Sequence, residues 1–172
     1  MTQRIFHRIY VRVLTWLGLA VDIHSKGKWP SYALSNFYHN SFVFDGISCR
    51  CMEGFIQSLK CSDRNEQLRV CKMRGKRAKQ FGQKIKGNPH YDIEVKGVCW
   101  NGVFINRHSE EYQSFIRKVY HAMFDQCTKF REALKATGTK RLFHTIGNPD
   151  AHNTILTEKE LCDFLIELRN KL

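Results

Sequence analysis

The hydrophobic positions between residues 35 and 60 follow first the spacing of strands and then that of a helix. Phe42, Phe44 and Ile47 flank a turn signal at Asp45-Gly46, which predicts a short extended hairpin. A short helix with an apolar stripe is predicted next, from hydrophobic residues at i, i+3, i+4 and i+7: Met52, Phe55, Ile56 and Leu59. Residues 35–60 are therefore the part of the chain around which we expect the rest to be organised.

The same short helix carries a polar face. Glu53, Gln57 and Lys60 share helical spacing, so a carboxylate, an amide and an ammonium line up on one side. A charged helix face is most often simply solvated. Spacing alone leaves both a solvated face and a functional site open.

The remaining pattern predicts a mixed chain in which helices dominate. We expect a strand at 21–24, a helical and basic stretch at 63–86, a loop at 87–89, a strand hairpin at 91–105 around Asn101-Gly102, helices at 109–127 and 129–137, a strand at 142–145 and a loop at 146–153. Thr157 and Glu160 have the spacing of a capping box and predict the start of a closing helix.

Residues 1–20 form a separate basic segment in front of a domain at 21–172. Arg4, Arg8 and Arg12 precede an apolar run at 13–21, which predicts a basic amphipathic helix that packs on the domain or touches an anionic surface. A signal peptide is the alternative. The run is shorter than the ~20 apolar residues of a membrane span, so no span is expected.

Length and composition fit one globular domain of 172 residues with a net charge of +12. Such a charge favours polyanionic partners: nucleic acid, nucleotides or an anionic membrane face. The seven cysteines include no C-x-x-C pair, so reduced thiols and a cytoplasmic location are expected rather than a disulfide framework or a zinc ribbon. His144 and His152 lack a third ligand, and no metal or organic cofactor is indicated.

Three motifs carry a family resemblance: LSNFY at 34–38, MEGFIQSLK at 52–60 and AKQFG at 78–82. They resemble the NADAR superfamily, also called YbiA-like, whose signature is similar to SNF, a short strand, E-x-x-x-Q-x-x-K and AK-x-x-G. Glu53, Gln57 and Lys60 fall on its most characteristic positions. Bacterial members have His where this chain has Gly54, and a glycine there permits close approach by a ligand or by backbone.

The resemblance covers most of residues 21–170. FDQ at 124–126 is similar to the family's KF-x-Q, although Met123 replaces the lysine. LFHTIGNPDAHN at 142–153 resembles a segment with an acidic residue ahead of Trp-Gly, but the Trp-Gly pair is absent. The family has a tryptophan at one further position. That position corresponds to Trp100 if this chain has extra residues between Trp100 and the following long helix, and to His108 if the match contains no gap.

Members of this family cleave N-glycosidic bonds at a ribose carbon, in ADP-ribose conjugates or in phosphorylated pyrimidine intermediates of riboflavin synthesis. The resemblance implies an α+β fold, one mostly helical domain with a small sheet, and this hydrolytic activity. The sugar becomes positively charged in such reactions, and a carboxylate stabilises it. The implied catalytic residues are Glu53 and Asp150, and the implied substrate-binding residues are Lys26, Lys60 and Lys79 for pyrophosphate, Ser35 and Asn36 for ribose or phosphate, Trp100 for stacking, Gln57 for positioning and His144 for hydrogen bonding.

The net charge favours one substrate within this family. An enzyme that approaches a phosphate backbone gains affinity from cations, so we expect ADP-ribose on a nucleic-acid base, with guanine in DNA as the family's precedent. The alternatives are a phosphoribosyl pyrimidine hydrolase and a non-catalytic module that binds ADP-ribose or DNA. The oligomeric state is left open by the sequence.

Overall fold

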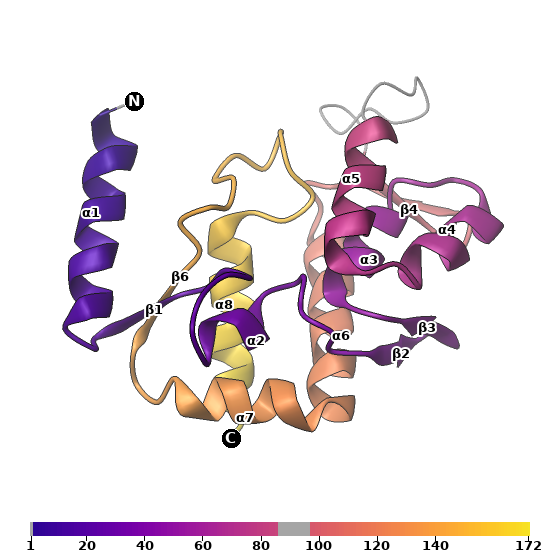
Figure 1. Cartoon of the computed structure of the whole chain (residues 1–172). Coiled ribbons are helices and arrows are strands. Elements are labelled where there is room, and N and C mark those ends of the chain that lie inside the picture. The colour runs from indigo at the N-terminus through magenta and orange to yellow at the C-terminus, as the bar shows by residue number, and fades with distance from the viewer. Residues whose placement is uncertain (1, 86–96) are drawn as a thin grey trace.

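A computed structural model describes residues 2–85 and 97–172 (Figure 1). Within these ranges the chain forms eight helices and six strands, which confirms the predicted α+β class. The elements are α1 Thr2–Trp16, β1 Ala20–Asp22, α2 Ser31–Leu34, β2 Phe42–Phe44, β3 Ile47–Cys49, α3 Met52–Ser58, α4 Arg64–Cys71, α5 Gly75–Ile85, β4 Val98–Trp100, β5 Val103–Ile105, α6 Glu110–Gln126, α7 Thr128–Ala136, β6 Arg141–Phe143 and α8 Glu158–Arg169. The loop predicted at 87–89 and the start of the strand predicted from 91 lie outside the described residues.

The strands form three separate pairs within the described ranges rather than one small sheet. β2–β3 and β4–β5 are antiparallel hairpins, and their tight turns place Asp45, Gly46, Asn101 and Gly102 at positive φ. Two consecutive residues at positive φ suit Asp-Gly and Asn-Gly, so both predicted turns are confirmed. β1 and β6 pair in parallel and bring segments far apart in the sequence together.

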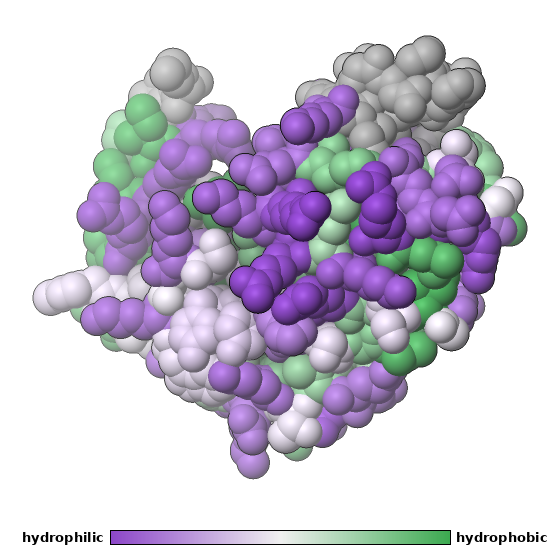
Figure 2. All heavy atoms as spheres, turned by 45° about the vertical axis from the view of Figure 1, so that its right-hand side comes forward, coloured by the Kyte–Doolittle hydropathy of each residue, from purple (hydrophilic) through white to green (hydrophobic). Residues whose placement is uncertain are grey.

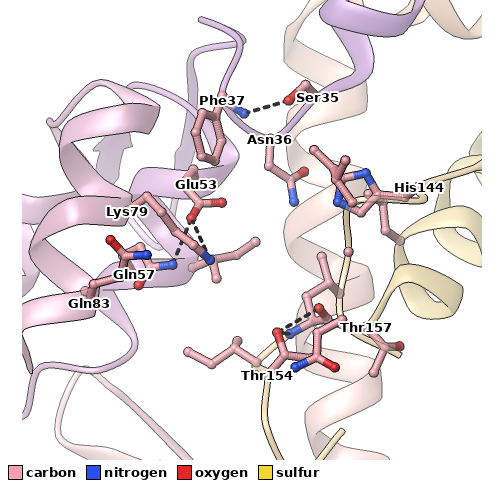
Figure 3. A pocket seen from close by; sticks show the side chains of 18 of the residues that line it. Ser35, Asn36, Phe37, Glu53, Gln57, Lys79, Gln83, His144, Thr154 and Thr157 are labelled. Carbon is pink, nitrogen blue, oxygen red and sulfur yellow. Dashed lines mark hydrogen bonds and ion pairs between the residues drawn. The ribbon is translucent and has the colours of Figure 1, made fainter. Parts of the chain in front are cut away.

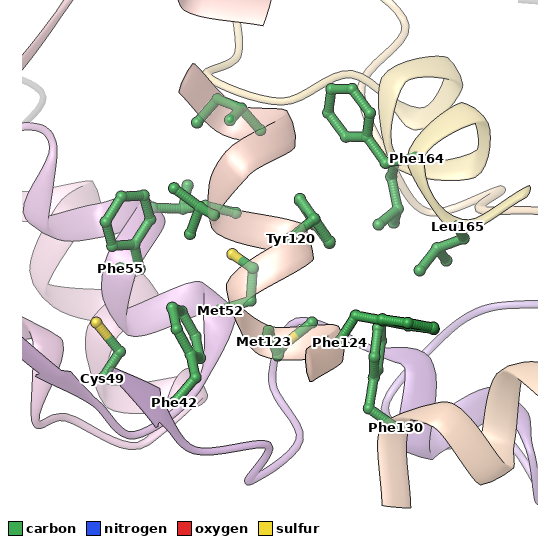
Figure 4. Packing of buried hydrophobic residues seen from close by; sticks show 14 of the residues in the cluster. Phe42, Cys49, Met52, Phe55, Tyr120, Met123, Phe124, Phe130, Phe164 and Leu165 are labelled. Carbon is green, nitrogen blue, oxygen red and sulfur yellow. The ribbon is translucent and has the colours of Figure 1, made fainter. Parts of the chain in front are cut away.

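Helix α6 lies at the centre of the core (Figure 4). Its Tyr120, Met123 and Phe124 lie between Phe55 of α3 on one side and Phe164 of α8 on the other. Ser109 caps this helix, since its hydroxyl accepts a hydrogen bond from the Tyr112 amide at 3.1 Å. The apolar side of α3 thus packs in the same core as α6, which leaves its polar side facing away from that core.

Gly54 of α3 packs against the end of α4. A Cβ at this position would lie 2.9 Å from the carbonyl oxygen of Cys71 and 3.2 Å from that of Val70. The sequence-based expectation of close approach at Gly54 is therefore confirmed for backbone, and a larger side chain has no room here.

The basic stretch predicted at 63–86 is divided into two helices, and the described part ends at residue 85. Asp63 caps α4 by accepting a hydrogen bond from the Glu66 amide at 2.8 Å. Gly75 begins α5, where a Cβ would lie 2.5 Å from the Phe37 Cα. This close contact joins the basic helix to the LSNFY segment.

The thiols are consistent with the predicted reduced state. All seven cysteines are free, and four of them are buried. Burial raises the pKa of Cys61 and of Cys162 to about 12, so both thiols are protonated and weakly reactive at neutral pH.

Candidate functional site

A cavity of about 410 Å³ opens between α3 and α5 on one side and the segments that follow β6 on the other (Figure 3). Its volume is within the range of small-molecule sites. Residues 35–37, the polar face of α3, one face of α5, residues 144–148 and residues 153–157 all contribute to its wall. We call this cavity the main pocket.

Glu53 is the carboxylate of the main pocket, and its residue is only 5% exposed. Its Oε1 accepts a hydrogen bond from Gln57 Nε2 at 2.8 Å and lies 3.7 Å from Lys79 Nζ. Burial raises the pKa of Glu53, while Lys79 and the Gln57 amide oppose that rise. Both of these contacts are made by Oε1.

Gln57 is positioned by the absence of a side chain at Gly82. A Cβ on Gly82 would lie 1.7 Å from Gln57 Oε1, so the amide occupies the space that a methyl group would need. Gln57 Oε1 is buried and accepts no hydrogen bond from the described residues. Glycine in α5 thus allows Gln57 to reach Glu53.

Replacement of Gly82 with Ala is expected to slow any reaction that depends on Glu53 by about 10²-fold, because a displaced Gln57 no longer orients the carboxylate. The free energy of unfolding should change by less than about 2 kcal/mol, since alanine favours a helix by about 1 kcal/mol. Steady-state kinetics and urea unfolding test this. Gln80→Ala on an exposed position of α5 is the control, and a fully active Gly82→Ala would show that Gln57 does not position Glu53.

The residues before β2 hold Glu53 from the other side. The Glu53 amide donates to the Asn36 carbonyl oxygen at 2.8 Å, and Asn36 Oδ1 accepts from the Tyr120 hydroxyl at 2.8 Å. Ser35 Oγ accepts from the Phe37 amide at 3.3 Å. Because Asn36 Oδ1 is engaged by α6, its amide nitrogen is the group turned toward the pocket (Figure 3).

His144 stands across the main pocket from Glu53 (Figure 3). The two parallel strands bring it there, and its Nδ1 lies 2.6 Å from the Ile23 carbonyl oxygen. A carbonyl only accepts, so Nδ1 carries the proton and Nε2 of the neutral ring is an acceptor. His144 is therefore suited to accept a hydrogen bond from a hydroxyl or amino group of a ligand.

A buried arginine, Arg107, supports the segment at residues 153–157 that forms part of the pocket wall. Arg107 is 1% exposed, donates from Nε to the Thr154 carbonyl at 3.0 Å, and binds both oxygens of Glu160 at 2.9 and 2.7 Å. Glu160 also completes the capping box with Thr157, as predicted. Thr154 and Thr157 line the main pocket, so the ion pair fixes this part of its wall.

The structure brings seven of the ten predicted site residues to the main pocket: Ser35, Asn36, Glu53, Gln57, Lys60, Lys79 and His144. Lys60 donates from Nζ to the Gly82 carbonyl oxygen at 3.2 Å, on the side of Lys79. Lys26 is exposed in the turn after β1, and its neighbour Ser25 lines the pocket in its place.

The structure places Trp100 in the hydrophobic core and not on the wall of the main pocket. Trp100 is 4% exposed and packs among aromatic rings, with its centroid 4.8 Å from that of Phe55 and 6.4 Å from that of Phe115. Its Nε1 donates to Asp45 at 2.8 Å. The hydrophobic gain of burying an indole with its N–H satisfied explains this position in the core. His108, the other candidate, is exposed, and its ring packs at a tilt against that of His152 with the centroids 4.5 Å apart.

The structure does not bring Asp150 to the wall of the main pocket either. Asp150 is exposed, and its carboxylate accepts from the His152 amide at 2.9 Å and from Asn153 Nδ2 at 2.5 Å. These hydrogen bonds lower the pKa of Asp150. Its carboxylate stabilises the loop turn, and Glu53 is the acidic residue that lines the main pocket.

Several wall residues were missed by reasoning from the sequence: Phe37, Gln83, Asn148, Asn153, Thr154 and Thr157. Phe37 lies within the motif LSNFY, and Gln83 directly follows the motif AKQFG. Their position in or next to these motifs could have indicated that both residues line the site. Asn148 and Asn153 lie within the motif LFHTIGNPDAHN, whereas Thr154 lies beyond it and is held by Arg107, which is distant in the sequence.

A second cavity of about 230 Å³ shares Phe37 with the main pocket. Arg50, Arg74 and His39 line it together with Cys51 and Gly75, and no acidic side chain of the described residues does. We call this the arginine pocket. It is suited to an anion next to whatever occupies the main pocket.

A family model described as "Bacteriophage protein GP30.3" matches residues 28–170. The chain belongs to the bacteriophage GP30.3 family. An uncharacterized 17.1 kDa protein of Enterobacteria phage T4, from the Gp30-rIII intergenic region, is 35% identical over 154 residues, covering 88% of this chain and 98% of the relative.

The fold of this GP30.3-family chain is similar to the NMR structure of the E. coli protein YbiA. The TM-score is 0.58 at 17% identity, with 90% of this chain and 84% of the other covered. The predicted YbiA-like fold is therefore confirmed. Searched over its described residues, the chain has no helix with the length and apolar character needed to cross a membrane.

Proposed function

We propose that this chain is an N-glycosidase of the NADAR type that removes ADP-ribose from modified nucleobases, with ADP-ribosylated guanine in DNA as its substrate. The observation that carries the proposal is a buried, hydrogen-bonded carboxylate facing a ligand-sized cavity. The NADAR resemblance of the motifs that line this cavity and the YbiA-like fold support it.

The proposed reaction uses Glu53 at the sugar carbon. The bond from the ribose carbon to the base nitrogen breaks, its electron pair leaves with the base, and the cationic sugar is stabilised by the carboxylate. Water then adds to the ribose carbon. The proton that water loses to Glu53 balances the proton that the departing nitrogen gains, so the products are ADP-ribose and the restored base.

Cations in and beside the main pocket favour a phosphorylated substrate. Lys60 and Lys79 approach the carboxylate side, where the pyrophosphate of ADP-ribose would lie. The arginine pocket extends this positive surface beyond Phe37 and is a place for a phosphate of the nucleic-acid chain. A hydrolase of a small free metabolite needs no such extension.

The direct test presents the purified chain with three substrates: an oligonucleotide bearing ADP-ribosylguanine, an ADP-ribosyl nucleoside and a phosphoribosyl pyrimidine. Chromatography follows release of base and sugar. Turnover fastest on the oligonucleotide is expected. Turnover confined to the pyrimidine favours the riboflavin-related activity, and binding of ADP-ribose without turnover of any substrate favours a binding module.

Lys79→Met is expected to move the acid limb of the pH profile of kcat/KM to higher pH. Lys79 favours the ionised form of Glu53, so its loss raises the pKa of that carboxyl further, and the reaction needs the ionised form. Rates measured across a pH series check this. Lys84→Met, exposed on the same helix and absent from the pocket wall, is the control, and equal profiles for both variants would contradict the assignment.

Joint replacement of Arg50 and Arg74 with Ala is expected to weaken binding of the modified oligonucleotide. The logarithm of the binding constant should also fall less steeply with the logarithm of the salt concentration, by about 1 to 2 in slope. Affinity for free ADP-ribose should stay within several-fold, because the main pocket is unchanged. Fluorescence anisotropy at several salt concentrations measures both. Lys135→Ala on α7, which lines neither pocket, is the control. An unchanged slope in the double variant would show that the arginine pocket does not bind the phosphates of the substrate.

A further inference from the structure

Helix α1 turns its polar side to the domain and its apolar side to solvent. Arg4 donates to the Gly147 carbonyl oxygen at 2.7 Å and Arg8 to that of Thr145 at 3.3 Å. The His7 ring contacts Phe143 at 5.8 Å, and Val11 is fully buried. The domain therefore holds this helix by Val11 and the polar residues around it, on the side opposite to the exposed hydrophobic residues.

The outward side is a continuous hydrophobic surface, which we call the α1 apolar face. At about 100° per residue, its members fall on one side of the helix. They are Ile5, Phe6, Ile9, Tyr10, Val13, Trp16 and Leu17, all roughly half exposed or more. Trp16 is 85% exposed. Figure 2 shows this green surface at the margin of a mostly hydrophilic molecule. A contiguous exposed patch of this kind marks an interaction surface.

Arginines flank both edges of the α1 apolar face. Arg12 falls beside Ile5 at one edge, and at the other Tyr10 accepts a hydrogen bond from Arg141 at 2.9 Å. Residues 1–21 contain no acidic side chain. An apolar strip between two cationic edges is complementary to a lipid surface, where acyl chains lie beneath anionic phosphates.

The same charges disfavour a second copy as the occupant. Two α1 apolar faces brought together would also bring their Arg12 and Arg141 side chains together, and α1 supplies no carboxylate to offset them. A nucleic acid offers phosphates but no apolar layer to cover seven hydrophobic residues. We propose that α1 binds the surface of an anionic membrane, lying in its plane with the α1 apolar face inserted.

The test uses the full chain with vesicles of phosphatidylcholine alone and with vesicles in which about one third of the lipid is phosphatidylglycerol. Co-sedimentation is expected with the anionic vesicles and to be at least about tenfold weaker with the neutral ones. Trp16→Glu should abolish binding, and Arg12→Glu with Arg141→Glu should weaken it about tenfold or more. None of these side chains lines the main pocket or the arginine pocket, and thermal stability reports whether the variants fold.

Phe104→Glu is the matched control, since Phe104 is an exposed hydrophobic residue of β5 at 58% exposure. It should bind anionic vesicles like the parent chain. The proposal is overturned if the parent chain does not bind these vesicles, or if Trp16→Glu binds them equally well. It is also overturned if light scattering shows a dimer that Trp16→Glu disrupts while lipid binding is absent.

Discussion

Glu53→Gln is expected to slow release of ADP-ribose from a modified base by about 10²–10⁴-fold. The amide retains the acceptor that Gln57 binds but has neither the negative charge that stabilises a cationic sugar nor the basicity to take a proton from water. Affinity for ADP-ribose should stay within several-fold. Single-turnover kinetics and calorimetric titration measure the two effects separately.

The exposed Glu132 of α7 provides the matched control for Glu53. Glu132→Gln makes the same chemical change away from both pockets and should leave kcat and KM unchanged. If Glu53→Gln hydrolyses at the parent rate, Glu53 has no part in the chemical step.

Glu160→Ala is expected to lower the free energy of unfolding by about 3–5 kcal/mol, because it leaves the guanidinium of Arg107 buried without its carboxylate. It also removes the capping box of α8. Chemical denaturation at neutral pH measures the loss. Glu160→Gln preserves the capping geometry but removes the charge, and it should cost clearly less than Glu160→Ala; a Glu160→Gln variant as stable as the parent chain would mean that the charge pair contributes nothing.

The effect of Glu160→Ala should depend on pH. Burial raises the pKa of Glu160, but hydrogen bonds from Arg107 and Thr157 outweigh it and hold that pKa below its ordinary range. A depressed folded-state pKa gives stabilisation that is present above the unfolded-state pKa and is lost as pH falls through the folded-state value. The difference between the parent chain and Glu160→Ala should therefore shrink below about pH 4.

Local patterns were enough to predict most elements of the fold. Asp45-Gly46 and Asn101-Gly102 predicted both hairpin turns correctly, and the capping box from Thr157 to Glu160 predicted the start of α8. Each of these features depends on residues that are close together in the chain. The i, i+4 spacing also placed Glu53 and Gln57 together, since one helix carries both.

Positions that depend on packing were not predictable in the same way. Trp100 is in the core because Phe55 and Phe115 complete a cluster around its ring, and that cluster joins three distant segments. Asp150 lies in the loop expected to face the ligand, but the path of that loop turns its carboxylate back to Asn153. Arg107 gave no sequence signal, since its partner Glu160 is 53 residues away.

The most direct measurement of the central claim is hydrolysis of an ADP-ribosylguanine oligonucleotide in ¹⁸O-labelled water, with products analysed by mass spectrometry. If water attacks the ribose carbon, the released ADP-ribose carries the label on its terminal ribose, the oligonucleotide returns to its unmodified mass, and Glu53→Gln releases neither product at the parent rate. Label on a phosphate, or a modified oligonucleotide that the chain leaves intact, would contradict N-glycosidic cleavage in this pocket.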